Sequence, residues 1–388
     1  MKSDEQNGKD LTKICFVMPY HIIENRGGGA EVQAWLLSRE LARRGYEVTY
    51  IAQSVQKKER SREVVDGVTV KWIRYVHHYK WASGLYYYRC LKESNPDVVV
   101  QRMTSFVTGV IGYYTKRYGK KFIWICTDNW SPVRWFFIKS QINYNRAKKI
   151  DPVKKGVLLL NALIYDFSRH FGMKHVTQSL VLNEYQKKAL RITYGNESIK
   201  LNLGHEIPSI LSSPDDRLKN RIILWVGHLG SSKRPEKFIE LARLCSNFKF
   251  RFIAIGDKDD KKHVSSLFCN KPDNLEWMGR LPFDLTLKWF DQATVVINTS
   301  IEEGFSNVIV QAWLRGVPVI TLGVNPDKII TKFGLGYVAD NVEEASKYLI
   351  LLTNNEKKYY QICMNISEYA VINFSIEKVA DIFLSMLN

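Results

Sequence analysis

Short apolar runs alternate with segments of helical periodicity along the whole chain of 388 residues, and this alternation restricts the fold more than any other feature. The runs are apolar almost from end to end, as in ICFVMP at 14–19 and PDVVVQRM at 96–103. Such strands are covered on both faces, which is typical of parallel sheets between layers of helices. The sequence therefore predicts an α/β fold with doubly wound parallel sheets.

The alternation occurs twice, which predicts two domains. Further apolar runs of the first half lie at 46–52, 68–76 and 121–127, and those of the second half at 221–227, 248–256, 274–279, 294–300, 318–322 and 336–340. A polar stretch, PSILSSPDDRLKN, separates the two series and is typical of a linker. We predict a first domain at 1–207, a linker at 208–220 and a second domain at 221–388, with a last helix at 376–387 that can pack on either domain.

The positive charge of the chain is confined to its first half. Residues 1–200 hold 34 Lys and Arg against 17 Asp and Glu, whereas residues 201–388 hold 22 of each, so the net charge of +17 arises before residue 201. A positive electrostatic field on one half of the chain attracts phosphate on lipid head groups, nucleic acid or a phosphorylated substrate. The alternative interpretation is a solvated basic face without a partner. Because no nucleic-acid recognition motif accompanies the charge, we favour an anionic lipid or a diphosphate as the partner.

The segment SPVRWFFIKSQINYNRAKK at 131–149 interrupts the alternation and mixes aromatic with basic side chains. This mixture suits a membrane interface or a docking surface, and an amphipathic helix or loop that caps the first domain is an equal alternative. The longest apolar stretch, 157–165, is far shorter than the roughly 20 residues that span a bilayer. The polar N-terminus lacks a signal-peptide core, so we expect a cytoplasmic protein.

Two glycine- and cation-containing turns follow strands and begin helices. In NRGGGAE at 25–31, three glycines let the backbone approach a ligand, and the helix N-terminus behind them suits phosphate, although a bare flexible turn is an equal explanation. In WVGHLGSSKRPE at 225–236, a strand leads to His228, and Lys233 and Arg234 precede a helix. Two cations at a helix start are well placed to hold a diphosphate.

A third turn, EEGFSNVIVQ at 302–311, combines a carboxylate with a helix start. Glu303 precedes Gly304-Phe305-Ser306, and a helix is expected from Ser306, whose first N–H groups can bind an anion. The Glu303 carboxylate can accept hydrogen bonds from hydroxyls beside that anion. Gln311 lies eight residues on and is expected to point to the same cleft, where its amide can donate and accept. The pattern predicts a ligand that is part anion and part polyol.

These segments, with NLEWMGRLP at 274–282, resemble the second domain of glycosyltransferase family 4, which has the GT-B architecture, and GGGAEVQAWLLSRELARRGYEVTYIA at 27–52 resembles the first loop and helix of that family. The resemblance implies two Rossmann-like domains that face a central cleft, the first binding the acceptor and the second the nucleotide-sugar. It also implies a retaining hexosyl transfer that needs no bound metal and no resident cofactor. The donor implied is a nucleotide-diphosphate sugar, with UDP favoured and GDP as the alternative.

The resemblance also assigns roles to residues. Glu303 matches the first Glu of the E-x7-E motif, which contacts the donor sugar hydroxyls, and Lys233 matches the residue that neutralises the departing diphosphate. The other residues expected to bind the donor are Gly28, Gly29, His228, Arg234, Gly304, Phe305, Ser306, Gln311 and Arg280. The chain departs from the family at two of these positions: Gln311 replaces a Glu that holds the ribose hydroxyls, and His228 replaces a common Arg.

For the acceptor, candidates come from strand ends in the first domain, because ligands of open α/β sheets bind there. Asp128 is the catalytic candidate, with Asn129 and Arg102 beside it, although an ordinary helix cap accounts for Asp128 equally well. We expect a lipid-linked or polysaccharide precursor as acceptor at the cytoplasmic membrane face. The alternatives are a catalytically weak partner subunit and, less well supported, a sugar-nucleotide epimerase, since the first domain has no cluster of carboxylates for acid-base catalysis.

Overall fold

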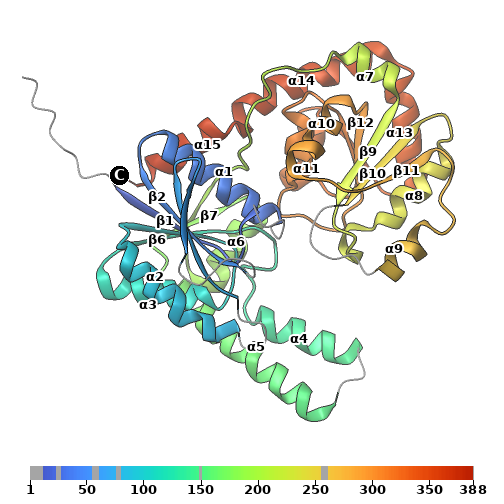
Figure 1. The fold of residues 1–388 in the computed structure, drawn as a ribbon. Helices are drawn as coiled ribbons and strands as arrows, with labels where there is room; N and C mark the ends of the chain where they lie inside the picture. The colour runs from blue at the N-terminus through green and yellow to red at the C-terminus, as the bar shows by residue number, and fades with distance from the viewer. Residues whose placement is uncertain are drawn as a thin grey trace, which may run out of the picture.

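The computed structural model describes residues 12–22, 28–54, 61–75, 80–147, 151–254 and 261–387, which form two α/β domains (Figure 1). The first sheet has the strand order β3-β4-β2-β1-β5-β6-β7-β8, and the second has the order β11-β10-β9-β12-β13-β14. Among the strand pairs of the described residues, β3 and β4 run antiparallel and the others run parallel. The predicted fold class is confirmed.

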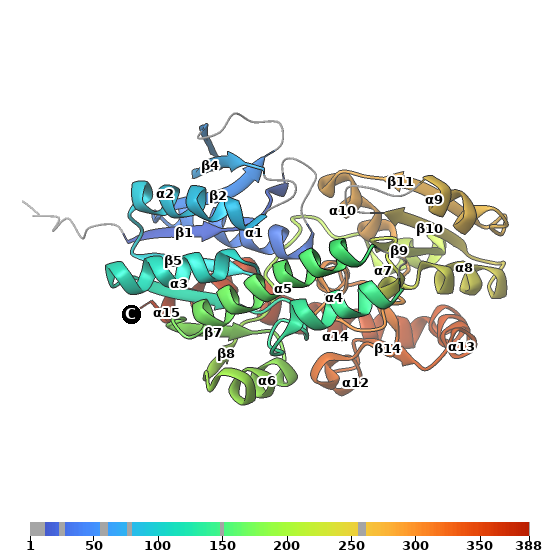
Figure 2. The ribbon, with the colours of Figure 1, turned by 90° about the horizontal axis from the view of Figure 1, so that it is seen from below.

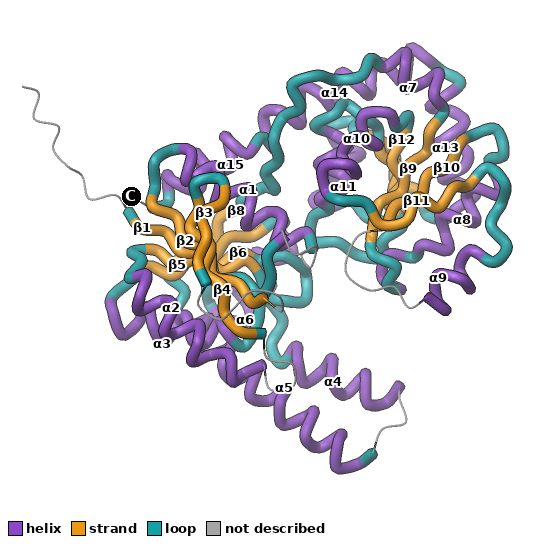
Figure 3. Tube along the Cα trace, in the orientation of Figure 1, coloured by secondary structure: helices purple, strands orange, loops and turns teal. Residues whose placement is uncertain are grey.

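In the first domain, the central strands are buried on both faces because helices cover the sheet from either side (Figure 3). Its strands are β1 (Lys13–Val17), β2 (Glu47–Ser54), β3 (Arg62–Val65), β4 (Val68–Arg74), β5 (Val98–Arg102), β6 (Lys121–Ile125), β7 (Gln178–Val181) and β8 (Ser198–Lys200). Its helices are α1 (Gly29–Arg43), η2 (Lys80–Ser83), α2 (Gly84–Ser94), α3 (Val107–Tyr118), α4 (Phe136–Ala147), α5 (Pro152–Met173) and α6 (Glu184–Tyr194).

The second domain repeats this layered plan around one continuous apolar core. Its strands are β9 (Ile222–Gly227), β10 (Lys249–Ala254), β11 (Leu275–Arg280), β12 (Val295–Asn298), β13 (Val319–Leu322) and β14 (Gly336–Ala339). Its helices are η3 (Ser231–Lys233), α8 (Pro235–Leu244), α9 (Lys261–Phe268), α10 (Phe283–Gln292), α11 (Asn307–Trp313), η4 (Pro326–Lys328), α12 (Ile329–Lys332) and α13 (Val342–Thr353).

The stretch expected to be a linker, 208–220, contains the helix α7 (Pro214–Asn220). The hydroxyl of Ser213 accepts a hydrogen bond from the Asp216 N–H at 3.1 Å, and Pro214 stands at the first helical position. Arg217 is buried and donates to the carbonyls of two residues that follow α11. The sequence analysis did not foresee a helix in this connection, because Ser, Pro and Asp mark both a turn and a helix start.

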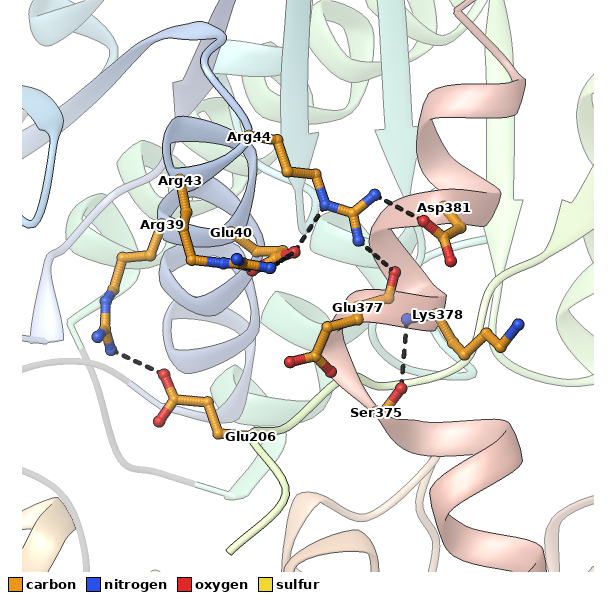
Figure 4. A network of polar contacts seen from close by, with 9 residues as sticks. All are labelled: Arg39, Glu40, Arg43, Arg44, Glu206, Ser375, Glu377, Lys378 and Asp381. Atoms are coloured by element: carbon orange, nitrogen blue, oxygen red, sulfur yellow. Dashed lines mark hydrogen bonds and ion pairs between the residues drawn. The ribbon is translucent and has the colours of Figure 1, made fainter. Parts of the chain in front are cut away.

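The last two helices return the chain from the second domain to the first. After α14 (Glu356–Phe374), α15 (Ile376–Ser385) lies beside α1, as Figure 4 shows. The Arg44 guanidinium joins the two helices: it contacts the carboxylates of Glu40 and Asp381, each at 2.6 Å, and donates to the Glu377 carbonyl at 2.8 Å. The apolar face of α15 is buried in the core of the first domain, so α15 completes that domain.

The segment 131–149, which left two interpretations open, contains the whole of α4 and the turn before it, and its last two residues lie outside the described residues. With α5, α4 makes a helical hairpin that projects from the first domain beyond its sheet (Figures 1 and 2). α5 packs closely on α3 at Gly172. A Cβ atom at this position would lie 2.1 Å from the Thr108 carbonyl oxygen, so only glycine allows the approach. The hairpin is therefore anchored at its base by one end of α5.

Candidate active site

A cavity of about 200 Å³ lies between the two domains, at the carboxyl ends of β5, β9 and β12. The first domain contributes Gly29, Ala30, Arg102, Thr127, Leu182 and Leu203. The second contributes Trp225, Val226, Gly227, His228, Lys233, Asn298, Thr299, Ser300, Glu303, Phe305, Ser306, Asn307 and Val308. Ligands of open α/β sheets bind at this kind of crevice, so the cavity is the candidate site.

Lys233 and Glu303, both predicted to be catalytic, form an ion pair on the second-domain wall of the cavity. Glu303 Oε1 also accepts a hydrogen bond from the Ser300 hydroxyl at 2.8 Å. Lys233 ends the short helix η3, and the Ile301 N–H donates to the Ser232 carbonyl at 2.8 Å, which fixes the turn beside β12. The pair presents an ammonium group that can bind phosphate and a carboxylate that can accept from sugar hydroxyls.

The glycines at the start of α1 meet the second domain at this cavity. A Cβ atom on Gly29 would lie 2.3 Å from Asn307 Nδ2, so a side chain at this position would collide with the first residue of α11. The Gly28 N–H donates to the Glu31 carboxylate at 2.8 Å. Burial raises the pKa of Glu31, and the backbone hydrogen bonds from Gly28 and Glu31 itself act against that shift. Residues 25–27 of the glycine motif lie outside the described residues.

The turn between Glu303 and α11 supplies two more lining residues, Phe305 and Ser306, as predicted, and His228 lines the same wall. Gly304 lies beside the cavity and contacts the first domain. A Cβ atom there would lie 2.7 Å from the Thr127 carbonyl oxygen, so glycine is required by the close approach of the two domains.

Two family models match the chain in adjoining segments: Glycosyltransferase Family 4 over residues 27–200 and Glycosyl transferases group 1 over residues 208–370. Together these matches cover most of both domains. The chain is a GT-B glycosyltransferase of the family 4 type. No curated protein matches the sequence.

Solved structures of glycosyltransferases share the fold at low sequence identity. Sucrose-phosphate synthase from Thermosynechococcus elongatus superposes with a TM-score of 0.75 at 12% identity, over 97% of this chain and 98% of that one. HepE from Anabaena in complex with UDP-glucose gives 0.70 at 14% identity, over 97% and 99%. WaaG, a glycosyltransferase involved in lipopolysaccharide biosynthesis, gives 0.66 at 17% identity, over 95% and 99%. At these identities the likeness concerns the fold, and it confirms the GT-B architecture.

In this glycosyltransferase, Arg234 does not have the position that we predicted. Its guanidinium donates to the carbonyls of Thr299 at 2.7 Å and Leu322 at 2.8 Å, and Arg234 does not line the cavity. The backbone of Arg234 is left-handed, with φ of 46°. Arg234 thus holds the ends of β12 and β13 together, and its contact with a diphosphate stays a prediction.

Asp128 caps a turn, whereas the alternative explanation for it was a helix cap. Its carboxylate accepts hydrogen bonds from the N–H groups of Trp130 at 2.9 Å and Ser131 at 2.6 Å, and from the Ser131 hydroxyl at 2.7 Å. Its neighbour Asn129 donates to the Glu302 carboxylate at 2.7 Å across the domain boundary. The geometry gives the predicted catalytic role of Asp128 no support.

The remaining two predicted donor contacts lie outside the cavity lining. Gln311 is buried within α11, where its carbonyl accepts from Arg315 at 3.3 Å. Arg280 is exposed at the end of β11, after Gly279 with φ of 73°. Contacts of Gln311 with a ribose and of Arg280 with a base stay predictions.

A polar network at the domain boundary escaped the sequence analysis. Asn307 Oδ1 accepts from Gln33 Nε2 at 2.8 Å and lies 3.0 Å from His205 Nε2, and Gln33 also exchanges two hydrogen bonds with the backbone of Gly204. Burial lowers the pKa of His205 to about 4, although its contact with Asn307 acts in the opposite direction. One residue of this network could have been noticed in the sequence: Gln33 is a polar residue on the apolar face of the helix AEVQAWLL.

Arg102 is a buried cation at the wall of the cavity. It is 2% exposed, and its Nε atom has no hydrogen-bond partner among the described residues. Burial lowers the pKa of Arg102 to about 10. A buried charge is costly unless it is paired, so the guanidinium is suited to an anion that enters the cavity.

Proposed function

We propose that the protein is an active, retaining glycosyltransferase that moves a hexosyl group from a UDP-sugar to a hydroxyl of a lipid-linked or polysaccharide precursor at the cytoplasmic face of a membrane. The observation that carries this proposal is the Lys233–Glu303 pair, which lies in the interdomain cavity opposite Arg102 and the start of α1. The pair combines the two chemistries that a sugar diphosphate requires, a cation for phosphate and an acceptor for hydroxyls.

The proposed reaction proceeds on one face of the sugar. The bond between the anomeric carbon and the diphosphate oxygen breaks, the acceptor oxygen bonds to the same face of that carbon, and the acceptor proton passes to the departing phosphate oxygen. Lys233 stabilises the charge that develops on the diphosphate, and Glu303 holds the sugar hydroxyls. Glu303 is the single carboxylate among the described lining residues, and its contacts with Lys233 and Ser300 suit positioning better than nucleophilic attack.

A UDP-sugar is the proposed donor because HepE, which shares the fold, was solved with UDP-glucose, and a GDP-sugar is the next candidate. The proposed reaction needs no bound metal. The second candidate function is a catalytically weak partner subunit, which Gln311 and His228 favour because they replace charged residues of the family. An epimerase is less well supported, since one lining carboxylate does not provide an acid-base pair.

The test is turnover of radiolabelled UDP-, GDP- and ADP-sugars by the purified full-length protein. Transfer or slow donor hydrolysis should occur with one nucleotide, and Lys233→Ala and Glu303→Gln should each lower kcat by about 100-fold, since each removes charge from the reacting centre. Lys237→Ala is the matched control, because Lys237 pairs with Glu240 on α8 outside the cavity. Tight binding of UDP without turnover of any donor would favour the partner subunit.

A further inference from the structure

The α4–α5 hairpin carries an unusual exposed apolar face. Leu160 and Phe167 of α5 are 58% and 59% exposed, and the same face continues along the helix through Val153, Val157, Leu163, Ile164 and Phe171. The spacing of four and three residues places these side chains on one side of α5 for nearly its whole length. The face therefore presents a continuous apolar strip to the surroundings.

The orientation of this face is fixed by polar contacts under the hairpin. The buried Asp166 carboxylate accepts from the Ile138 N–H at 2.9 Å at the start of α4, and the buried Arg169 donates to the Val133 carbonyl. Together with the close packing of Gly172 on α3, these contacts occupy the inner side of α5. The apolar strip is thus held outward; Figure 1 shows the hairpin projecting from the body of the molecule, and Figure 2 shows it in front when the molecule is seen from below.

The charge around the strip indicates what can cover it. Residues 134–174 contain nine Lys and Arg but two acids, and one of these, Asp166, is buried. Lys139 and Lys154 are exposed on the two helices. Pairing of two copies through this face would bring like charges together, whereas an anionic lipid surface both neutralises the cations and covers the apolar strip.

An aromatic ring also supports contact with the surface of a bilayer. Within the described part of the chain, no helix has the length and hydropathy to cross a bilayer. Trp135 is 39% exposed and packs edge-on against Phe167, with ring centroids 5.5 Å apart. Tryptophan is enriched where proteins meet the polar-apolar boundary of a bilayer, because its ring is amphipathic. Trp135 is therefore suited to lie at that boundary beside the apolar strip.

A second cavity lies at the base of the hairpin. It has a volume of about 220 Å³, and most of its lining is apolar. The lining includes Phe137 and Tyr165 from the hairpin, Met18 and Met103 from the ends of β1 and β5, and Phe106 and Val107 from the start of α3. This cavity lies beside the carboxyl ends of β1 and β5, and Arg102, the last residue of β5, lines the interdomain cavity. Its position suits the apolar part of a lipid-borne acceptor.

We propose that the α4–α5 hairpin docks the protein on an anionic lipid bilayer, with the apolar strip of α5 in the interface and the lysines of both helices on the head groups. This inference rests on the proposed function for the role of the lipid, since a lipid-linked acceptor is what the docked enzyme would reach. The docking itself can be measured without any turnover.

The test uses the full-length protein and vesicles of phosphatidylcholine, alone or mixed with phosphatidylglycerol. The wild type should sediment with the mixed vesicles, more weakly with neutral ones, and less as salt is added. The double variant Leu160→Glu/Ile164→Glu should bind the mixed vesicles at least about tenfold more weakly, because two anions enter the apolar strip. Ile192→Glu is the matched control, since Ile192 is 86% exposed on α6 of the same domain, and it should bind like the wild type.

Equal binding of the wild type to both kinds of vesicle, no binding to either, or unchanged binding by the double variant would overturn the proposal. So would a wild-type dimer in sedimentation velocity that the double variant abolishes, because a second copy would then cover the strip. Donor hydrolysis is measured on the same samples. If vesicle binding follows the prediction while no donor is turned over, docking stands and the proposed function fails.

Discussion

At the residue scale, the site depends on close approaches that tolerate few substitutions. Gly29→Ala would place a methyl group where the Asn307 amide now lies, so the Asn307 side chain would have to leave its contacts with Gln33 and His205, or the two domains would have to separate slightly. We expect kcat/KM for the donor to fall by about 10- to 100-fold, because small displacements of positioned groups are costly to catalysis. Steady-state kinetics with the preferred donor checks this. Gly156→Ala on α5 is the control, since it has open space around it, and it should leave kinetics unchanged.

Arg102 allows a test in which stability and binding are expected to change in opposite directions. Arg102→Gln removes a buried cation without a hydrogen bond at Nε, so we expect stability to stay level or rise. The same change should weaken binding of UDP or of a phosphorylated acceptor by about 1.5–3 kcal/mol, the usual contribution of a hydrogen bond to a charged group. Thermal unfolding and calorimetric titration measure the two effects. A large loss of stability would mean that Arg102 has a structural partner instead.

Residues that the sequence analysis located correctly owe this to local patterns. Lys233 and Glu303 each lie in the turn that follows an apolar strand, and strand ends of a parallel sheet meet at one edge. Arg234 and Asp128 follow strands in the same way, but their side-chain directions depend on a left-handed residue and on a turn, which residue type alone does not specify. The network of Gln33, His205 and Asn307 joins residues far apart in the chain, and one sequence does not reveal such a pairing.

At the scale of elements, the central strands were predictable because burial on both faces leaves apolar runs. The edge strand β3 alternates exposed and half-buried residues and pairs on one side with β4, so its sequence, REVV, gives a weak signal. The short strands β7 and β8 also escaped the prediction. The hairpin of α4 and α5 was ambiguous for a physical reason: an exposed apolar face has the same periodicity as a face that packs on the protein.

Because α15 packs on the first domain, substitutions at two adjacent residues of α15 should lower the free energy of unfolding by unequal amounts. Phe383 is fully buried against the first sheet, so Phe383→Ala should lower the free energy of unfolding by about 3–5 kcal/mol. Its neighbour Ile382 is 41% exposed, and Ile382→Ala should cost less than about 1 kcal/mol. Urea unfolding followed by circular dichroism compares the two. Equal costs would mean that α15 does not complete the first core in solution.

At the scale of the whole molecule, the cavity exists because the two domains touch around it. Asn183 of the first domain donates to the Gly304 carbonyl at 2.7 Å, and the Glu184 N–H donates to the Asp327 carboxylate at 3.0 Å. Asp327 also pairs with Lys200. These contacts link the N-terminus of α6 to the turns after β12 and β13, so a change in the domain angle would disturb the positions of Glu303 and Lys233.

His205 makes this boundary sensitive to acid. Its pKa lies near 4 in the folded protein and near 6.5 when exposed, because burial disfavours the charged imidazolium by more than the hydrogen bond with Asn307 favours it. A lowered pKa means that its stabilising contribution is complete above pH 6.5 and is lost as the pH falls toward 4. At 1.36 kcal/mol per pKa unit, the loss by His205 alone should reach about 3 kcal/mol near the lower limit.

His205→Gln should therefore flatten the pH dependence of unfolding, whatever it does to stability at neutral pH. Urea midpoints measured between about pH 7.5 and about pH 5 give the slope, which should be smaller for the variant than for the wild type. Burial also lowers the pKa of His21, in the first domain, to about 4. Because His21 is present in both proteins, its contribution to the pH dependence of unfolding is common to both. His175→Gln is the comparison: burial also lowers the pKa of His175, but this side chain is only half-buried, so the variant should flatten the slope less than His205→Gln does. An identical slope for His205→Gln would mean that the imidazole at the domain boundary reaches water before unfolding, and that the two domains separate around it in solution.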